Sequence, residues 1–340
     1  MVTAWQIPLD PLNDPSLTDP KLSEPIKWGY RIFVDTPREA PRFTGGKVAC
    51  INCHLNAGQR ERSLPLVGVA GMFPEYNNRA ARLITLADRV VDCFLRSENA
   101  TGRDAEALPS PTSKEVLAVS AYLSWLSRGY AVGTNPSWRG RNAIAADKLI
   151  PVDKLDMRAG KAIYAERCTS CHGADGQGVQ IGDKKAGPLW GVDSWNDGAG
   201  AARVYTLAGI IRYAMPYLNP GSLTDEEAQQ VAAFITSKPR PAFPFKDRDY
   251  PGSKVPADAV YYRATAVRDA ATETAYPSGD RRSGDRRLDR RSGDRRSDRR
   301  SPIERSPIQR SVTGTIWISV GNLAGCPPGF GLGYPCEISD

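Results

Sequence analysis

The chain has 340 residues, enough for two domains, and 41% of them are hydrophobic, an ordinary value for a globular protein. The formal net charge is +7, but residues 280–300 contain ten Arg and five Asp, a net of +5, so the remainder is close to neutral. This distribution argues against a nucleic-acid partner. No run of about 18 apolar residues occurs, so no transmembrane segment is expected.

The N-terminal third is predicted to contain an arm and a first domain. Residues 1–24 are rich in Pro and Asp without periodicity, and we expect an extended N-terminal arm there. Residues 25–132 are expected to form the first domain, with helices predicted over residues 79–97 and 113–127.

Residues 50–54 of this domain read Cys-Ile-Asn-Cys-His, and residues 168–172 read Cys-Thr-Ser-Cys-His. A c-type haem needs two thiols at this spacing to form thioethers with its vinyl groups, and an adjacent imidazole to bind its iron. A single Cys-x-x-Cys could instead be a redox disulfide or half of a zinc site. Because the two motifs contain both histidines of the chain, they favour haem. The sequence thus predicts two haem c groups, attached at Cys50, Cys53, Cys168 and Cys171, with His54 and His172 as proximal iron ligands.

Covalent haem attachment in bacteria is expected outside the cytoplasmic membrane, which favours a periplasmic location. The first residues lack the basic region and apolar stretch of a signal peptide. We interpret the sequence as a mature form or as a gene model without its true start.

Cys93 lies 39 residues after His54, within the helix predicted over 79–97. A step of 100° per residue places it on a face with four arginines, which are Arg79, Arg82, Arg89 and Arg96. An arginine face is often only solvated, and a lone cysteine is often a small buried hydrophobe. Guanidinium groups would lower the pKa of a neighbouring thiol and would bind a small dianion. We therefore favour Cys93 as a functional thiolate.

Residues 133–151 are expected to be a linker, and residues 152–245 a second domain. A helix is predicted before the second haem motif and another over 224–236, where Thr224 and Glu227 form a capping box. Helical signals dominate both domains, so the predicted fold class is all-α, with two cytochrome c-like domains that each bind one haem.

Met215, 43 residues after His172, is the candidate distal ligand of the second haem. A His/Met pair raises the reduction potential of a haem. The alternative is a core side chain, since Met fills irregular gaps well.

Residues 246–340 are predicted to be a disordered tail. Residues 283–291 recur almost unchanged at 292–300, with few apolar side chains. We assign no function to Cys326 and Cys336, which could pair with each other.

The chain resembles the dihaem thiosulfate dehydrogenases from about Trp28 to Arg240. The segment Asp-Cys-Phe-Leu-Arg-Ser-Glu-Asn at 92–99 is more specific than the haem motifs. The resemblance implies an oxidoreductase that joins two thiosulfates into tetrathionate and passes electrons to a soluble or membrane-associated acceptor. It also implies Cys93 as distal ligand of the first haem and transient carrier of substrate sulfur.

The resemblance further implies that Arg79, Arg89 and Ser97 bind substrate, whereas Arg82 and Arg96 are supported mainly by helical geometry. Ala214 stands where some members have Lys, which argues against a switch of ligand at the second haem. Two other interpretations stay open from the residues: a non-catalytic dihaem electron carrier, and the same enzyme working as a tetrathionate reductase.

Overall fold

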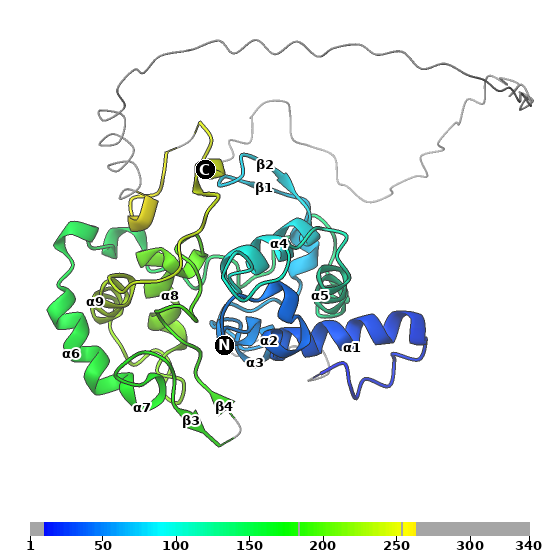
Figure 1. Ribbon diagram of the computed structural model, residues 1–340, viewed down its shortest axis with the longest axis horizontal. Helices are drawn as coiled ribbons and strands as arrows, with labels where there is room; N and C mark the ends of the chain where they lie inside the picture. The colour runs from blue at the N-terminus through cyan, green and yellow to red at the C-terminus, as the bar shows by residue number, and fades with distance from the viewer. Residues whose placement is uncertain (1–9, 183, 253, 263–340) are drawn as a thin grey trace, which may run out of the picture. The chain divides into compact units, whose positions relative to one another are not determined.

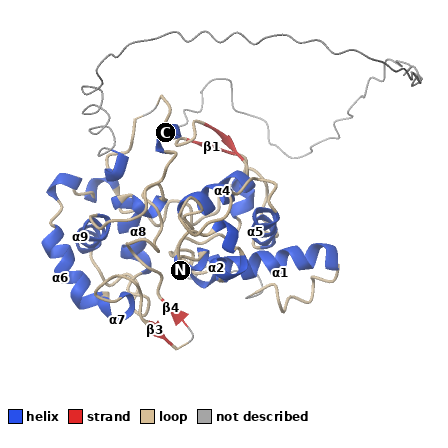
Figure 2. Cartoon of the chain, viewed as in Figure 1, coloured by secondary structure: helices blue, strands red, loops and turns tan. Residues whose placement is uncertain are grey.

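The computed structural model describes residues 10–182, 184–252 and 254–262. The chain divides into two units, residues 1–278 and 279–340. The second unit lies outside the described residues, and so do Cys326 and Cys336 and most of the tail predicted over 246–340. Within the described part, helices dominate and the strands form two short hairpins (Figure 2). The all-α prediction is confirmed.

The first domain is built on helices α1 (Pro20–Val34), α4 (Leu86–Arg96) and α5 (Lys114–Trp125) (Figure 1). Helices α1 and α5 pack closely because Gly29 faces the backbone of α5, where an added Cβ would lie 1.9 Å from the carbonyl oxygen of Ala118. The short helices α2 (Thr36–Glu39) and α3 (Leu55–Gly58) flank the first haem motif.

A hairpin replaces the first part of the helix predicted over 79–97. Strands β1 (Glu75–Asn77) and β2 (Arg82–Ile84) pair antiparallel before α4 begins. The prediction is wrong there because Thr85 caps α4: its hydroxyl accepts from the N–H of Asp88 at 3.1 Å, and the Asp88 carboxylate accepts from the N–H of Thr85 at 2.9 Å. The helix predicted over 113–127 is confirmed as α5.

The second domain packs α6 (Met157–Arg167) and α8 (Val204–Ala214) against α9 (Asp225–Thr236). The short α7 (Thr169–His172) contains the end of the second haem motif, and β3 (Gln180–Ile181) pairs with β4 (Lys184–Lys185). The predicted capping box is confirmed, since the Thr224 hydroxyl accepts from the N–H of Glu227 at 3.1 Å.

The structure differs from the prediction at both ends of the two-domain region, in the arm expected over 1–24 and in the tail expected over 246–340. Helix α1 begins at Pro20, inside the arm expected over 1–24, and Asp14 is buried where it accepts from Trp125 Nε1 at 2.8 Å. The described residues of 246–262, which we call the returning segment, pack onto both domains instead of forming part of a tail: the N–H of Tyr250 donates to the carbonyl of Arg79 at 2.7 Å, and Asp258 pairs with Arg203 at 2.7 Å. Single buried anchors such as Asp14 leave no signal in composition, so the sequence did not show these contacts.

The linker expected over 133–151 contacts both domains. Trp138 Nε1 donates to the carbonyl of Val67 at 2.7 Å, while Ile144 is buried in the core of the second domain. Several residues of this linker, among them Trp138, Asn142 and Ile144, also line the cavity at the first haem motif.

Candidate active site and haem sites

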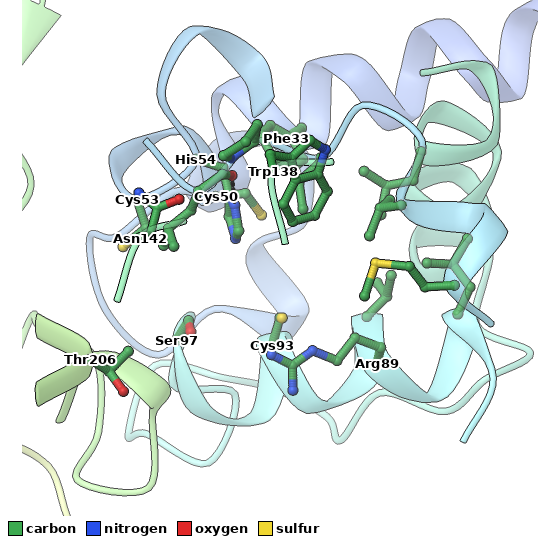
Figure 3. Close-up of a pocket in the computed structure, with 18 of the residues that line it drawn as sticks. Phe33, Cys50, Cys53, His54, Arg89, Cys93, Ser97, Trp138, Asn142 and Thr206 are labelled. Atoms are coloured by element: carbon green, nitrogen blue, oxygen red, sulfur yellow. Dashed lines mark hydrogen bonds between the residues drawn. The ribbon is translucent and has the colours of Figure 1, made fainter. Parts of the chain in front are cut away.

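The first haem motif opens into a cavity of about 580 Å³. Its wall is mostly apolar, formed among others by Phe33, Val69, Leu86, Val90, Phe94, Val119 and Leu123. Cys50, Cys53 and His54 line one side, and Cys93 on α4 faces the cavity from the opposite side (Figure 3). A large apolar cavity with two thiols and an imidazole on one wall and a further thiol opposite fits a haem c with two axial ligands.

The imidazole of His54 is held in a ligating orientation. Its Nδ1 lies 2.7 Å from the carbonyl oxygen of Leu64, so that Nδ1–H donates and leaves Nε2 available for iron. Burial lowers the pKa of His54, which keeps the ring in the neutral form that binds metals.

Three of the predicted site residues share one face of α4. Arg89, Cys93 and Ser97 follow one another at four-residue spacing, and all three line the cavity. Ser97 ends the helix, and its N–H donates to the carbonyl of Cys93 at 2.7 Å. The Arg89 side chain is 48% exposed, and its guanidinium lies 3.6 Å from the Asp92 carboxylate.

The thiol of Cys93 differs from the expectation of a lowered pKa. Burial raises the pKa of Cys93, and the opposing charge of Arg89 does not overcome this effect. Neighbouring charges can be read from the sequence, whereas the desolvation of the thiol depends on how the chain packs. A thiol that coordinates a metal is deprotonated by the metal itself. Iron, rather than arginine, would therefore stabilise the thiolate form of Cys93.

Arg82 and Arg96 lie outside the cavity lining. Arg82 belongs to β2, is 57% exposed and pairs with Asp88 at 3.2 Å, so the helix that placed it in the substrate set does not exist there. Arg96 does lie on α4, but its buried guanidinium binds Asp92 and Asp249, each at 2.7 Å. Two carboxylates satisfy its charge, which leaves the structure without support for substrate contact by Arg96.

Arg79 does not line the cavity, but it acts on Cys93 through its charge. It follows β1 outside the cavity lining, and its Nη1 donates to the carbonyl of Gly198 at 2.9 Å. Its charge nevertheless lowers the pKa of the Cys93 thiol, as does that of Arg89. Arg79 therefore adds positive potential near Cys93 from a fixed position.

The second haem motif has its own donor set. Cys168 and Cys171 are partly buried thiols, not joined in a disulfide. Burial lowers the pKa of His172, whose Nδ1 is near the Gly187 carbonyl but makes no hydrogen bond of normal geometry among the described residues. Met215 directly follows α8, where its N–H donates to the carbonyl of Ile211 at 3.2 Å. Two thiols and a neutral imidazole fit a second haem c; ligation by Met215 stays a prediction.

Sequence reasoning missed Glu98, which lines the first cavity and is only 2% exposed. Burial raises the pKa of Glu98 to about 8, opposed by a hydrogen bond with Cys50. A single Glu after a helix has no distinguishing sequence pattern, so only the structure reveals it. The cavity is also lined by Arg203, Tyr205 and Thr206 of the second domain. No local sequence motif predicts this contribution.

Two family models match the chain. Residues 40–132 match SoxA/TsdA, cytochrome c domain, and residues 155–235 match cytochrome C oxidase, cbb3-type, subunit III. The prediction of two cytochrome c-like domains is confirmed. The chain is 43% identical over 237 residues to a thiosulfate dehydrogenase of Allochromatium vinosum, an alignment that covers 67% of this chain and 82% of that protein. The chain belongs to the thiosulfate dehydrogenase family.

A second relative and a solved structure from the thiosulfate dehydrogenase family also match this chain. Thiosulfate dehydrogenase of Stutzerimonas stutzeri is 39% identical over 222 residues, which is 65% of this chain and 69% of that protein. A solved structure titled thiosulfate dehydrogenase (TsdBA) from Marichromatium purpuratum, in its as-isolated form, matches with a TM-score of 0.61 at 35% identity. That match covers 68% of this chain and 49% of the other. The predicted family is confirmed, and the protein is an oxidoreductase.

Proposed function

We propose that this protein oxidises two thiosulfate ions to tetrathionate at the first haem site and passes the two electrons through a second haem to an external acceptor. The observation that supports this most is the position of Cys93, which faces the cavity opposite His54 with Arg89 beside it. A carrier that only relays electrons has no need of both a thiol and a guanidinium group beside its haem site.

Two haem c groups would be held by this chain. His54 and Cys93 would be the axial ligands of the first iron, and His172 and Met215 those of the second. When bound, each haem supplies a one-electron acceptor, so the pair can hold both electrons of one turnover.

The reaction forms one S–S bond: two thiosulfate dianions become one tetrathionate dianion, and two electrons leave. The dianions repel each other, so clustered cationic donors are needed to bring them together. Arg89 and Ser97 would bind the sulfonate oxygens inside the cavity by charge-assisted and neutral hydrogen bonds. Arg79 would add positive potential, and the apolar wall would limit water.

The acceptor in this proposal is a soluble or membrane-associated redox protein in the periplasm. Every helix in the described part of the chain is too short or too polar to cross a membrane. We assign no role in nucleic-acid binding, because the described domains contain the nearly neutral part of the sequence.

The holoprotein with both haems loaded should be mixed with thiosulfate and an artificial electron acceptor, with tetrathionate measured directly. We expect tetrathionate in proportion to reduced acceptor, and Cys93→Ala should lower the rate by at least about 10⁴-fold, the size of loss seen when one member of a catalytic group is removed. Absence of tetrathionate from the fully loaded wild-type protein would exclude the enzyme.

The same pair of proteins separates the alternatives. A non-catalytic carrier would exchange electrons with small redox dyes equally well with and without Cys93. A tetrathionate reductase would consume tetrathionate when supplied with a reduced dye faster than it forms it from thiosulfate. Low-temperature EPR of the oxidised wild-type protein should show a low-spin thiolate-ligated haem that Cys93→Ala lacks.

A further inference from the structure

The loop that follows the first haem motif, residues 59–66, contacts both His54 of that motif and the turn that follows Met215. On one side its Leu64 carbonyl accepts from Nδ1 of His54 at 2.7 Å. On the other side Nη2 of Arg60 donates to the carbonyl of Tyr217 at 2.9 Å. The Arg60 guanidinium also lies 4.4 Å from the centre of the Tyr217 ring, a cation–π distance. Tyr217 is two residues beyond Met215.

A second arginine of the same loop points to the same place. The guanidinium of Arg62 lies 5.7 Å from the ring centre of Tyr213, which is two residues before Met215. The Arg62 carbonyl in turn accepts from the side chain of Asn142. Met215 is therefore bracketed by two tyrosines, each in contact with an arginine from the first domain.

The chain after Met215 has little else to hold it. Tyr217 is 46% exposed and Leu218 is 91% exposed, so this turn buries little apolar surface. Its own domain contributes a hydrogen bond from the N–H of Asn219 to the carbonyl of Pro216 at 2.9 Å, and one from Arg212 to the carbonyl of Gly221 at 2.9 Å, at the far end of the turn. Near Met215 itself, the described cross-domain hydrogen bond is that of Arg60.

We propose that Arg60 is a positioning residue for Met215: it holds the turn so that the thioether stays on the second iron. The proposal rests on the second haem ligation in the proposed function. Arg60 is matched to this task because its planar group donates to a backbone carbonyl and stacks on the ring of the same residue. The loop that orients His54 thereby also sets the distal ligand of the other haem.

The physical consequence is a change in redox potential. A His/Met pair raises the potential of a haem, so an iron that loses its thioether part of the time has a lower average potential. Removal of Arg60 shifts the balance between bound and released Met215 without touching the haem attachment residues.

The test compares Arg60→Ala with wild type as full-length holoproteins, by the iron–methionine charge-transfer band of the oxidised spectrum and by potentiometric titration of each haem. We expect Arg60→Ala to lose at least about half of the band, with a lower midpoint for the second haem only. Arg60→Lys, which keeps the charge, should retain more of the band. Tyr217→Leu, which removes the ring but keeps the carbonyl, should lose an intermediate part.

Arg248→Ala is the matched control, since Arg248 is exposed and lies 4.6 Å over the ring of Phe245, remote in sequence from either haem motif. It should leave band and potentials unchanged. An Arg60→Ala protein with the wild-type band and midpoint would overturn the proposal, as would a wild-type protein without the band. Failure of the proposed function would show differently, as a normal band in a protein that forms no tetrathionate.

Discussion

At the scale of single residues, the direction of a side chain decides which arginines face the site. Arg82 and Arg89 have similar surroundings. Each guanidinium lies near an Asp carboxylate, and the side chains are 57% and 48% exposed. Arg89 lies one helical turn before Cys93 and lines the cavity, whereas Arg82 is on β2 and outside the lining. The two residues form a natural pair for testing the substrate role.

We predict that Arg89→Gln raises the KM for thiosulfate by about 10-fold or more, because hydrogen bonds to charged groups contribute about 1.5–3 kcal/mol. Arg82→Gln should change KM by less than about twofold, since that change removes an exposed ion pair with Asp88 and a local hydrogen bond to the carbonyl of Leu83, both outside the cavity. Steady-state kinetics with an artificial acceptor measures both. Equal effects of the two substitutions would contradict the assignment of Arg89 to substrate.

At the scale of secondary-structure elements, α4 and α9 both begin with a capping box. Thr85 and Thr224 each accept from the N–H three residues on at 3.1 Å, and an acidic side chain completes each capping box. Of these two helices, only α4 presents side chains to the first cavity. The two caps therefore separate a loss of helix stability from a loss of site geometry.

We predict that Thr85→Ala and Thr224→Ala each lower the free energy of unfolding by about 1 kcal/mol, or about 2–4 °C in Tm. Thr85→Ala should in addition raise the KM for thiosulfate by up to about fivefold, because the first turn of α4 positions Arg89. Calorimetry and kinetics on the same samples check this. A KM increase in Thr224→Ala of the same size would show that the effect is not local to α4.

The contact between α1 and α5 gives a second prediction at this scale. Gly29→Ala should destabilise the protein by about 1–3 kcal/mol, because its Cβ would lie 1.9 Å from the Ala118 carbonyl and the helices would have to move apart. At Gly200 an added Cβ meets no atom within 4 Å among the described residues, so Gly200→Ala should be close to neutral. Urea denaturation of the holoproteins compares them, and equal midpoints would contradict the close packing.

At the scale of the whole molecule, the returning segment connects the two domains. Asp249 binds Arg96 of α4 with two contacts of 2.7 Å. Asp258 accepts from the N–H of Tyr205 at 3.1 Å, near the start of α8, and pairs with Arg203 at 2.7 Å. One stretch of chain thus neutralises a buried charge in the first domain and caps a helix of the second.

We predict that a chain ending at residue 262 keeps the Tm and the thiosulfate activity of the full chain, whereas a chain ending at residue 245 loses at least about 5 °C. The shorter chain leaves Arg96 buried with one carboxylate instead of two, and loss of a partner from a buried ion pair costs about 3–5 kcal/mol. Thermal unfolding followed by haem absorbance is the measurement. As a control in the full chain, Asp249→Ala should reproduce much of this loss and the exposed neighbour Asp247→Ala should not.

The parts of the site that could be predicted are those whose residues lie close together in the sequence. The haem motifs and the shared face of Arg89 and Cys93 depend on residues close together in the sequence, so their spacing was informative, whereas Ser97 was implied by the family resemblance. The start of α4 was missed because the capping box at Thr85 was not weighed against the apolar periodicity. The burial of Arg96 and Glu98 could not be predicted, since it depends on segments distant in the sequence.

The amino-acid sequence by itself determined the class of cofactor, the two-domain helical plan and the family, because covalent haem attachment and helix periodicity are local properties. Only the tertiary structure decided which arginines meet the cavity, that Cys93 is desolvated, and that Arg60 reaches the turn after Met215. Those facts depend on contacts between residues up to 157 positions apart, such as Arg60 and Tyr217. Burial and long-range charge pairing arise only when such segments pack together.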